Sequence, residues 1–301
     1  DEKVTAILPV TEDDKQNDNS YVFFATASGM VKRVQLSQFK NLRANGLRAV
    51  ELNDGDNLIG VAITDGEQDI MLFSNEGKAI RFNESKIRAM GRTAKGVRGM
   101  RVTLLANQGI EDDDTELEDD SQDDQDNDSV VAVSRVVSLV VAPQQGEILC
   151  ACERGFGKRT PVSDFPVKGR GGKGIIAIKT TARNGELVQA LAVTDADDIV
   201  LISDAGTLVR TPVGQIAQTG RNAQGVTLIR ISQDESLVSI ALVEGGSEDE
   251  LDEESLETAL ADNIAQDGTD LQYSADLQDI ELSEALQQDG LLEADAQQLD
   301  D

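Results

Sequence analysis

Short apolar segments alternate with glycine-containing turns along most of this chain, and the alternation repeats. The segments VFFATASG, IMLFSNEG, ILCACERG and IVLISDAG each end on a glycine that precedes an arginine by four residues. A second turn rich in Gly, Lys and Arg follows about ten residues later, and another apolar segment closes each repeat. The apolar segments are rich in Val, Ile and Leu and are bounded by Gly, Asn and Asp, which is typical of strands joined by turns.

A unit of about 50 residues, copied side by side, is indicated by the spacing of the first glycines. Gly29, Gly77, Gly155 and Gly206 are separated by 48, 78 and 51 residues, so the second repeat carries an insertion. About four strands per unit is the signature of a propeller blade. We therefore expect residues 1–244 to form an all-β, propeller-like β-pinwheel array of four-stranded blades.

The start of the chain resembles the end of a repeat. The segment VTAILPV at 4–10 matches the closing segments LIGVAIT at 58–64, LVQALAV at 187–193 and LVSIALV at 237–243. No repeat start precedes it, so the sequence predicts four full repeats plus the end of a fifth. We expect the chain to be a fragment of a longer protein.

Two segments account for the acidity of the chain. Residues 107–129 contain twelve Asp or Glu, residues 245–301 contain nineteen, and neither segment has a Lys or Arg. This composition predicts a disordered insertion and a disordered acidic tail. The formal net charge is −29, but without these segments 25 of the 56 acidic residues remain against all 27 basic residues. The folded array can therefore present a basic face.

The residues needed for catalysis or metal binding are missing from the sequence. There is no histidine, and two cysteines are too few for a structural zinc site. Cys150 and Cys152 stand two apart in one strand pattern, so we expect buried, reduced thiols. The GxGxxG match at 169–174 is followed by a strand pattern where a dinucleotide site needs a helix. We expect no enzymatic activity, cofactor or metal in this chain. It has no membrane-spanning stretch, and we expect it in the cytoplasm.

The repeated basic residues are the candidates for function. They recur at matched positions, and adjacent glycines would let backbone N–H groups approach an anion. Single-strand binders stack bases on aromatic side chains, whereas only 3% of this chain is aromatic. Duplex DNA, held by its phosphates without base readout, is the expected partner. The candidate DNA-binding residues are Lys32, Arg33, Arg43, Arg81, Arg92, Lys95, Arg98, Lys158, Arg159, Lys168, Arg170, Gly171, Gly172, Lys173, Arg210 and Arg221.

These segments resemble a known family. VFFATASGMVKR, ELNDGDNLIGV, IMLFSNEGKAIRF, IRAMGRTAKGVRGMR and GRNAQGVTLIRI are similar to the C-terminal domain of DNA gyrase A. The resemblance implies a β-pinwheel that wraps duplex DNA. It also implies a heterotetramer with the rest of gyrase A and with gyrase B, in the bacterial cytoplasm at the nucleoid. That enzyme introduces negative supercoils with ATP and Mg²⁺ bound outside this fragment.

Two alternatives stay open. The family's diagnostic box, QRRGGKG, belongs to the first blade, whereas KGRGGKG at 168–174 lies in a later repeat and resembles a degenerate copy. The C-terminal domain found in topoisomerase IV shares the expected architecture and has weaker boxes. A protein-interaction propeller, whose acidic segments bind a basic partner, is the alternative from another class.

Overall fold

The computed structural model describes residues 5–11, 17, 19–40, 46–103, 133–232 and 234–243. The predicted acidic insertion, the acidic tail and Arg43 lie outside these residues. The chain divides into two compact units, Asp1–Gly245 and Gly246–Asp301. Everything described below belongs to the first unit.

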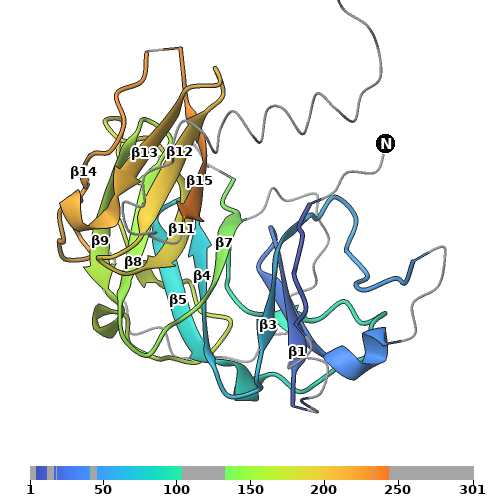
Figure 1. Ribbon diagram of the computed structural model, residues 1–301. Coiled ribbons are helices and arrows are strands. Elements are labelled where there is room, and N and C mark those ends of the chain that lie inside the picture. The colour runs from blue at the N-terminus through green and yellow to red at the C-terminus, as the bar shows by residue number, and fades with distance from the viewer. Residues whose placement is uncertain are drawn as a thin grey trace, which may run out of the picture. The chain divides into compact units, whose positions relative to one another are not determined.

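Four antiparallel sheets, one per repeat, form blades 1 to 4, which confirms the all-β pinwheel prediction (Figure 1). Within each repeat two strands form a hairpin, a short 3-10 turn follows, and a closing strand pairs with the first strand of the hairpin. The 3-10 turns are η1 (Leu36–Phe39), η2 (Glu84–Lys86), η3 (Val162–Asp164) and η4 (Val213–Gln215). In spatial order, blade 1 consists of β3 (Leu58–Thr64), β1 (Tyr21–Thr26), β2 (Met30–Gln35) and β6 (Val97–Arg98), and blade 2 of β7 (Val136–Val141), β4 (Asp69–Ser74), β5 (Lys78–Asn83) and β10 (Ile175–Ile176). Blade 3 consists of β11 (Leu187–Val193), β8 (Glu147–Cys152), β9 (Phe156–Pro161) and β14 (Val226–Thr227). Blade 4 consists of β15 (Leu237–Val243), β12 (Asp198–Ser203) and β13 (Leu208–Pro212).

The fourth strand of each complete blade comes from the following repeat. Strand β6 of the second repeat pairs with β2, β10 of the third with β5, and β14 of the fourth with β9. The sequence predicts four strands per repeat, but it does not show that one strand is exchanged. Because no later repeat supplies a strand to β13, blade 4 has three strands among the described residues.

The core lies between the blades. Along β4, Ile70 and Leu72 pack in the cluster shared with blade 1, whereas Met71 and Phe73 pack in the cluster shared with blade 3. Successive side chains of a strand point to opposite faces, and both faces of an inner blade are covered. This is why the hairpin strands are apolar without interruption.

The closing strands form the inner edges of the blades. The pairs β3 with β7, β7 with β11 and β11 with β15 are in contact, so these strands succeed one another in repeat order (Figure 1). The outer strands β2, β5 and β9 lie at the opposite edge of each sheet and carry the exchanged strands.

The segment before the first blade differs from its expected role as a closing strand. Residues 5–11 form no strand, and Ile7 is 88% exposed. Leu8 alone packs against the apolar cluster on the outside of blade 1. The described residues provide no hairpin strand with which this segment could pair.

Candidate nucleic-acid interface

Three glycine-rich basic turns lie on the outer strands of blades 1, 2 and 3. We call residues 91–96, 169–174 and 220–225 the second, third and fourth basic turns, after their repeats. The residue at the start of each turn is anchored to the preceding blade: the N–H of Met90 donates to Arg33, that of Lys168 to Arg81, and that of Thr219 to Arg159, at 2.8–2.9 Å from the carbonyl oxygens. The turns therefore follow repeat order along the outer edges.

Backbone hydrogen bonds connect each turn to the next. The Gly171 N–H donates to the Gly99 carbonyl at 2.6 Å, and the Arg101 N–H donates to the Gly172 carbonyl at 2.9 Å. The Lys179 N–H donates to the Ala223 carbonyl at 3.1 Å in the same way. The second, third and fourth basic turns are thus linked through the residues that follow the second and third turns.

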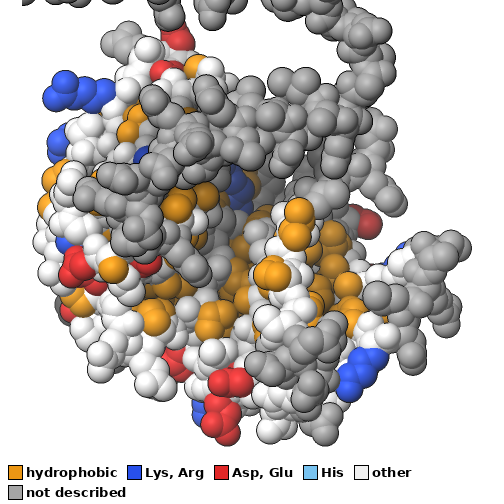
Figure 2. All heavy atoms as spheres, viewed as in Figure 1, with side chains coloured by type: hydrophobic (Ala, Val, Ile, Leu, Met, Phe, Trp, Pro, Cys, Tyr) orange, Lys and Arg blue, Asp and Glu red, His pale blue; other side chains and the backbone are white. Residues whose placement is uncertain are grey.

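The sequence segments that contain the basic turns are rich in Lys and Arg and have no acidic residue. Residues 86–103, 166–183 and 216–232 together contain 13 Lys or Arg and no Asp or Glu. Lys and Arg side chains lie mainly toward the margins of the face in Figure 2, while apolar side chains gather over its middle. Among the predicted residues, exposed or half-buried members of this row are Arg92, Lys95, Arg98, Lys168, Arg170, Lys173 and Arg221.

Three of the predicted arginines lie instead in the contacts between blades. The Arg159 guanidinium, 8% exposed, pairs with Glu147 at 2.7 Å and with Asp195, and its Nε donates to the Ile216 carbonyl at 2.7 Å. Arg81 pairs with Asp69 at 2.9 Å and donates to carbonyls of the third repeat. Arg33 donates to the Gly66 carbonyl at 2.8 Å and lies 3.6 Å from Glu84. Their geometry favours joining neighbouring repeats over contacting a ligand.

Two predicted lysines lie beneath the turns. Lys32 is 1% exposed and its ammonium donates to the carbonyls of Arg92 and Ala94 in the second basic turn. Lys158 is fully buried and donates to the Gly220 carbonyl at 3.0 Å and to Thr160 at 2.7 Å. Burial lowers the pKa of both, that of Lys32 to about 8. These ammonium groups stabilise the turns through hydrogen bonds to turn carbonyls.

The remaining predicted residues, Arg210, Gly171 and Gly172, differ in their surroundings. Arg210 is 53% exposed and pairs with Asp198 of its own blade at 2.6 Å, and among the described residues no later repeat covers it. Gly171 has a φ of +84°, but its N–H is already donated to Gly99, so it is not available to an anion. Gly172 contributes its carbonyl, and not its N–H, to the contact between turns.

Sequence reasoning missed one repeated cation. Arg101, Lys179 and Arg230 each stand five residues after the last glycine of a basic turn, and all three are exposed. The position is visible as a repeat in the sequence. It is obscured because the first repeat has Glu51 there.

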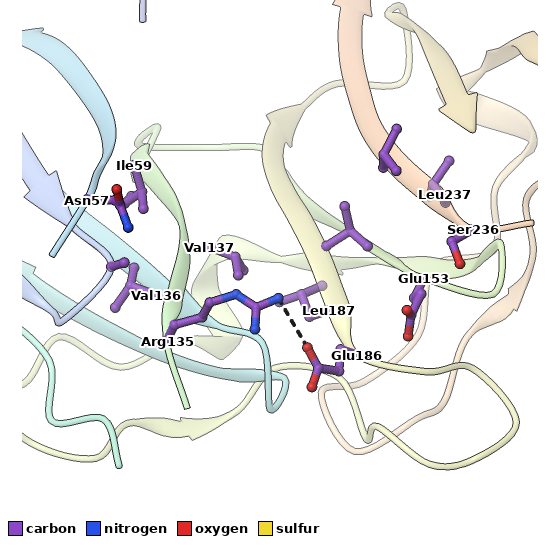
Figure 3. A pocket seen from close by; sticks show the side chains of 13 residues that line it. Asn57, Ile59, Arg135, Val136, Val137, Glu153, Glu186, Leu187, Ser236 and Leu237 are labelled. Atoms are coloured by element: carbon purple, nitrogen blue, oxygen red, sulfur yellow. Dashed lines mark hydrogen bonds and ion pairs between the residues drawn. The ribbon is translucent and has the colours of Figure 1, made fainter. Parts of the chain in front are cut away.

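A cavity lies at the inner edges of the blades. It has a volume of about 530 Å³ and is lined by residues at the beginnings of β3, β7, β11 and β15 (Figure 3). Arg135 and Glu186 approach within 3.3 Å across it, and both side chains are about half exposed. The predicted cysteines are elsewhere: both thiols are buried as expected, and burial raises the pKa of Cys150 to about 12. Within the described part of the chain, no group of three metal-ligating side chains is found.

The family model described as "DNA gyrase C-terminal domain, beta-propeller" matches residues 20–65, 68–115, 146–195 and 197–244. The chain belongs to this family. Each matched range begins at or just before the hairpin of one blade, so the family's repeats correspond to the blades. The prediction from sequence resemblance is confirmed.

Relatives in the gyrase family are considerably longer than this chain. The DNA gyrase A protein of Haemophilus influenzae is 47% identical over 84% of the chain, and that of Escherichia coli is 46% identical over 90%. The matched regions span 28% and 27% of these two relatives.

Solved structures share the blade architecture. A DNA gyrase A C-terminal domain superposes with a TM-score of 0.60 and 26% identity, covering 75% of this chain and 66% of the other. The C-terminal domain of a DNA topoisomerase IV gives a TM-score of 0.62 at 24% identity, covering 81% and 67%. The second likeness concerns the fold alone. In the described part of the chain, no helix has the length and apolarity required to cross a bilayer.

Proposed function

We propose that this chain binds duplex DNA without sequence specificity and bends it along the row of basic turns, as the DNA-wrapping domain of a DNA gyrase A protein. The linked series of second, third and fourth basic turns, in sequence segments that contain no Asp or Glu, carries the proposal. Phosphates carry no sequence information, and a row of separate cations is suited to following a backbone. Bending 20–30 bp costs on the order of 1–6 kcal/mol, which contacts distributed along an arc can offset.

The chain contributes binding rather than chemistry in this proposal. Its buried thiols have raised pKa values, which disfavours the reactive thiolate. The catalytic residues, the ATP and Mg²⁺ sites and gyrase B would belong to the rest of a bacterial, cytoplasmic supercoiling enzyme. The 46–47% identity to gyrase A proteins supports gyrase over topoisomerase IV, for which the likeness is one of fold.

An electrophoretic mobility shift with unrelated duplexes of equal length tests this function. We expect similar affinities for all duplexes at low salt, weaker binding of single strands of the same length, and steep weakening as salt rises. Increased ligation of the duplex into small circles in the presence of the protein would report bending. Absence of duplex binding, together with binding of a basic protein, would favour the scaffold function instead.

A further inference from the structure

The residue five positions after each basic turn reaches the next repeat. The backbone N–H of Arg101 is fixed to Gly172 in the third basic turn, and that of Lys179 is fixed to Ala223 in the fourth. Each of these exposed side chains therefore starts from the edge of a turn that belongs to the following repeat. The preceding repeat thus contributes a basic side chain to the junction between two repeats.

The following repeat contributes an arginine to the same junction. The Arg170 guanidinium donates to the Arg98 carbonyl at 3.0 Å, and the Arg221 guanidinium donates to the Ile176 carbonyl at 3.2 Å. Arg98 and Ile176 occupy matched positions, three residues before Arg101 and Lys179. Two successive junctions therefore each receive one cation from either repeat, Arg101 with Arg170 and Lys179 with Arg221.

The first junction has the opposite charge at this position. Glu51 stands five residues after Gly46, which has the same left-handed conformation, with a φ of +72°, as Gly96, Gly174 and Gly225. The Glu51 carboxylate opposes the effect of burial on the pKa of Lys32, whose ammonium binds the second basic turn. Glu51 thus lies near that turn, as Arg101 lies near the third.

We propose that Arg101 and Lys179 are phosphate-binding residues, each forming a two-repeat clamp with Arg170 or Arg221, and that Glu51 weakens phosphate binding at the first junction. The inference rests on the proposed duplex binding. Cations held from two sides can contact one phosphate or two adjacent ones, whereas a carboxylate at the equivalent place repels them. The two clamps then lie at the junctions of the second with the third repeat and of the third with the fourth.

Salt titrations of duplex binding test the clamps. Arg101→Ala and Lys179→Ala should each lower the slope of log K against log salt by about 0.9, and the double variant by about 1.8. Arg101→Lys and Lys179→Arg keep the charge and should keep the slope. Lys40→Ala removes an exposed lysine of the first repeat, which contributes to neither clamp, and should also leave the slope unchanged.

Substitution of Glu51 should strengthen duplex binding, a result that a misfolded variant would not give. Glu51→Lys should tighten duplex binding several-fold at low salt and raise the slope by about 0.9, because a third clamp is created. Glu51→Gln should tighten binding less and leave the slope unchanged. If the parent protein binds no duplex, the proposed function fails. If it does bind, and the triple variant Lys168→Ala/Arg170→Ala/Lys173→Ala lowers the slope while Arg101→Ala, Lys179→Ala and Glu51→Lys do not change it, the clamp inference alone is overturned.

Discussion

Gly155 and Ile229 meet backbone to backbone at the seam between blades 3 and 4. The Gly155 carbonyl accepts the Ile229 N–H at 3.2 Å, and a Cβ atom added to Gly155 would overlap the Ile229 carbonyl oxygen. Gly29 meets Met100 and Gly77 meets Ile178 in the same way. Gly206 has the equivalent place and a φ of +86°, but an added Cβ would have nothing within 4 Å.

This contrast predicts unequal effects of alanine. Gly155→Ala and Gly206→Ala both place a side chain at positive φ, at a cost of about 1–2 kcal/mol. Gly155→Ala should cost about 1–3 kcal/mol more, because its methyl group displaces the exchanged strand. Urea unfolding of the two variants measures the difference. Equal losses would show that the seam does not resist the added methyl group.

Alanine substitutions of the matched residues Arg159 and Arg210 should also lower stability by unequal amounts. Arg159→Ala leaves Glu147 without its partner inside the seam, so we expect a loss of about 3–5 kcal/mol in unfolding free energy. Arg210→Ala removes a guanidinium that is 53% exposed, so solvent screens its pair with Asp198 and the loss should be smaller, about 1 kcal/mol. Thermal unfolding checks the order. A weaker effect at Arg159 than at Arg210 would contradict the structural role.

Lys32 should make stability depend on pH in the alkaline range. Burial lowers its folded-state pKa to about 8 from 10.5, and the Glu51 carboxylate partly opposes this. Between these values the unfolded chain binds more protons than the folded chain, so the unfolding free energy rises with pH. The parent protein should therefore gain stability relative to Lys32→Met from about pH 8 to 10.5. A constant difference across that range would show that the ammonium is better solvated than its burial indicates.

The third basic turn should carry a measurable share of DNA binding. Replacing Lys168, Arg170 and Lys173 with Ala should lower the salt slope by about 2.7 if each contacts a phosphate. The loss should be similar for unrelated duplexes, because phosphate contacts are not sequence-specific. The charge-conserving set Lys168→Arg, Arg170→Lys and Lys173→Arg is the control. A loss confined to one duplex sequence would instead indicate base readout.

The repeat pattern was sufficient to predict the blades, but it did not show which basic side chains face solvent and which are enclosed between blades. Spacing alone places Arg159 after a hairpin glycine, where a strand arginine commonly faces solvent. In the structure the following repeat lies over that strand, so Arg159 is enclosed. Strand exchange joins residues more than 50 positions apart, and no local periodicity reveals it. The turns stand out in the sequence because glycine and basic residues recur there together, whereas the repeat of Arg101 and Lys179 is interrupted by Glu51 in the first repeat.

The exchanged strands have a mechanical consequence. The segment that presents Arg170 and Lys173 continues directly into β10, which is hydrogen-bonded to β5 of the preceding blade. A stiff duplex held by these side chains would pull on the seam itself and not on a dangling loop. Its elastic recoil would then be borne by strand pairing between repeats, so the curvature of the DNA and the angle between neighbouring blades would change together.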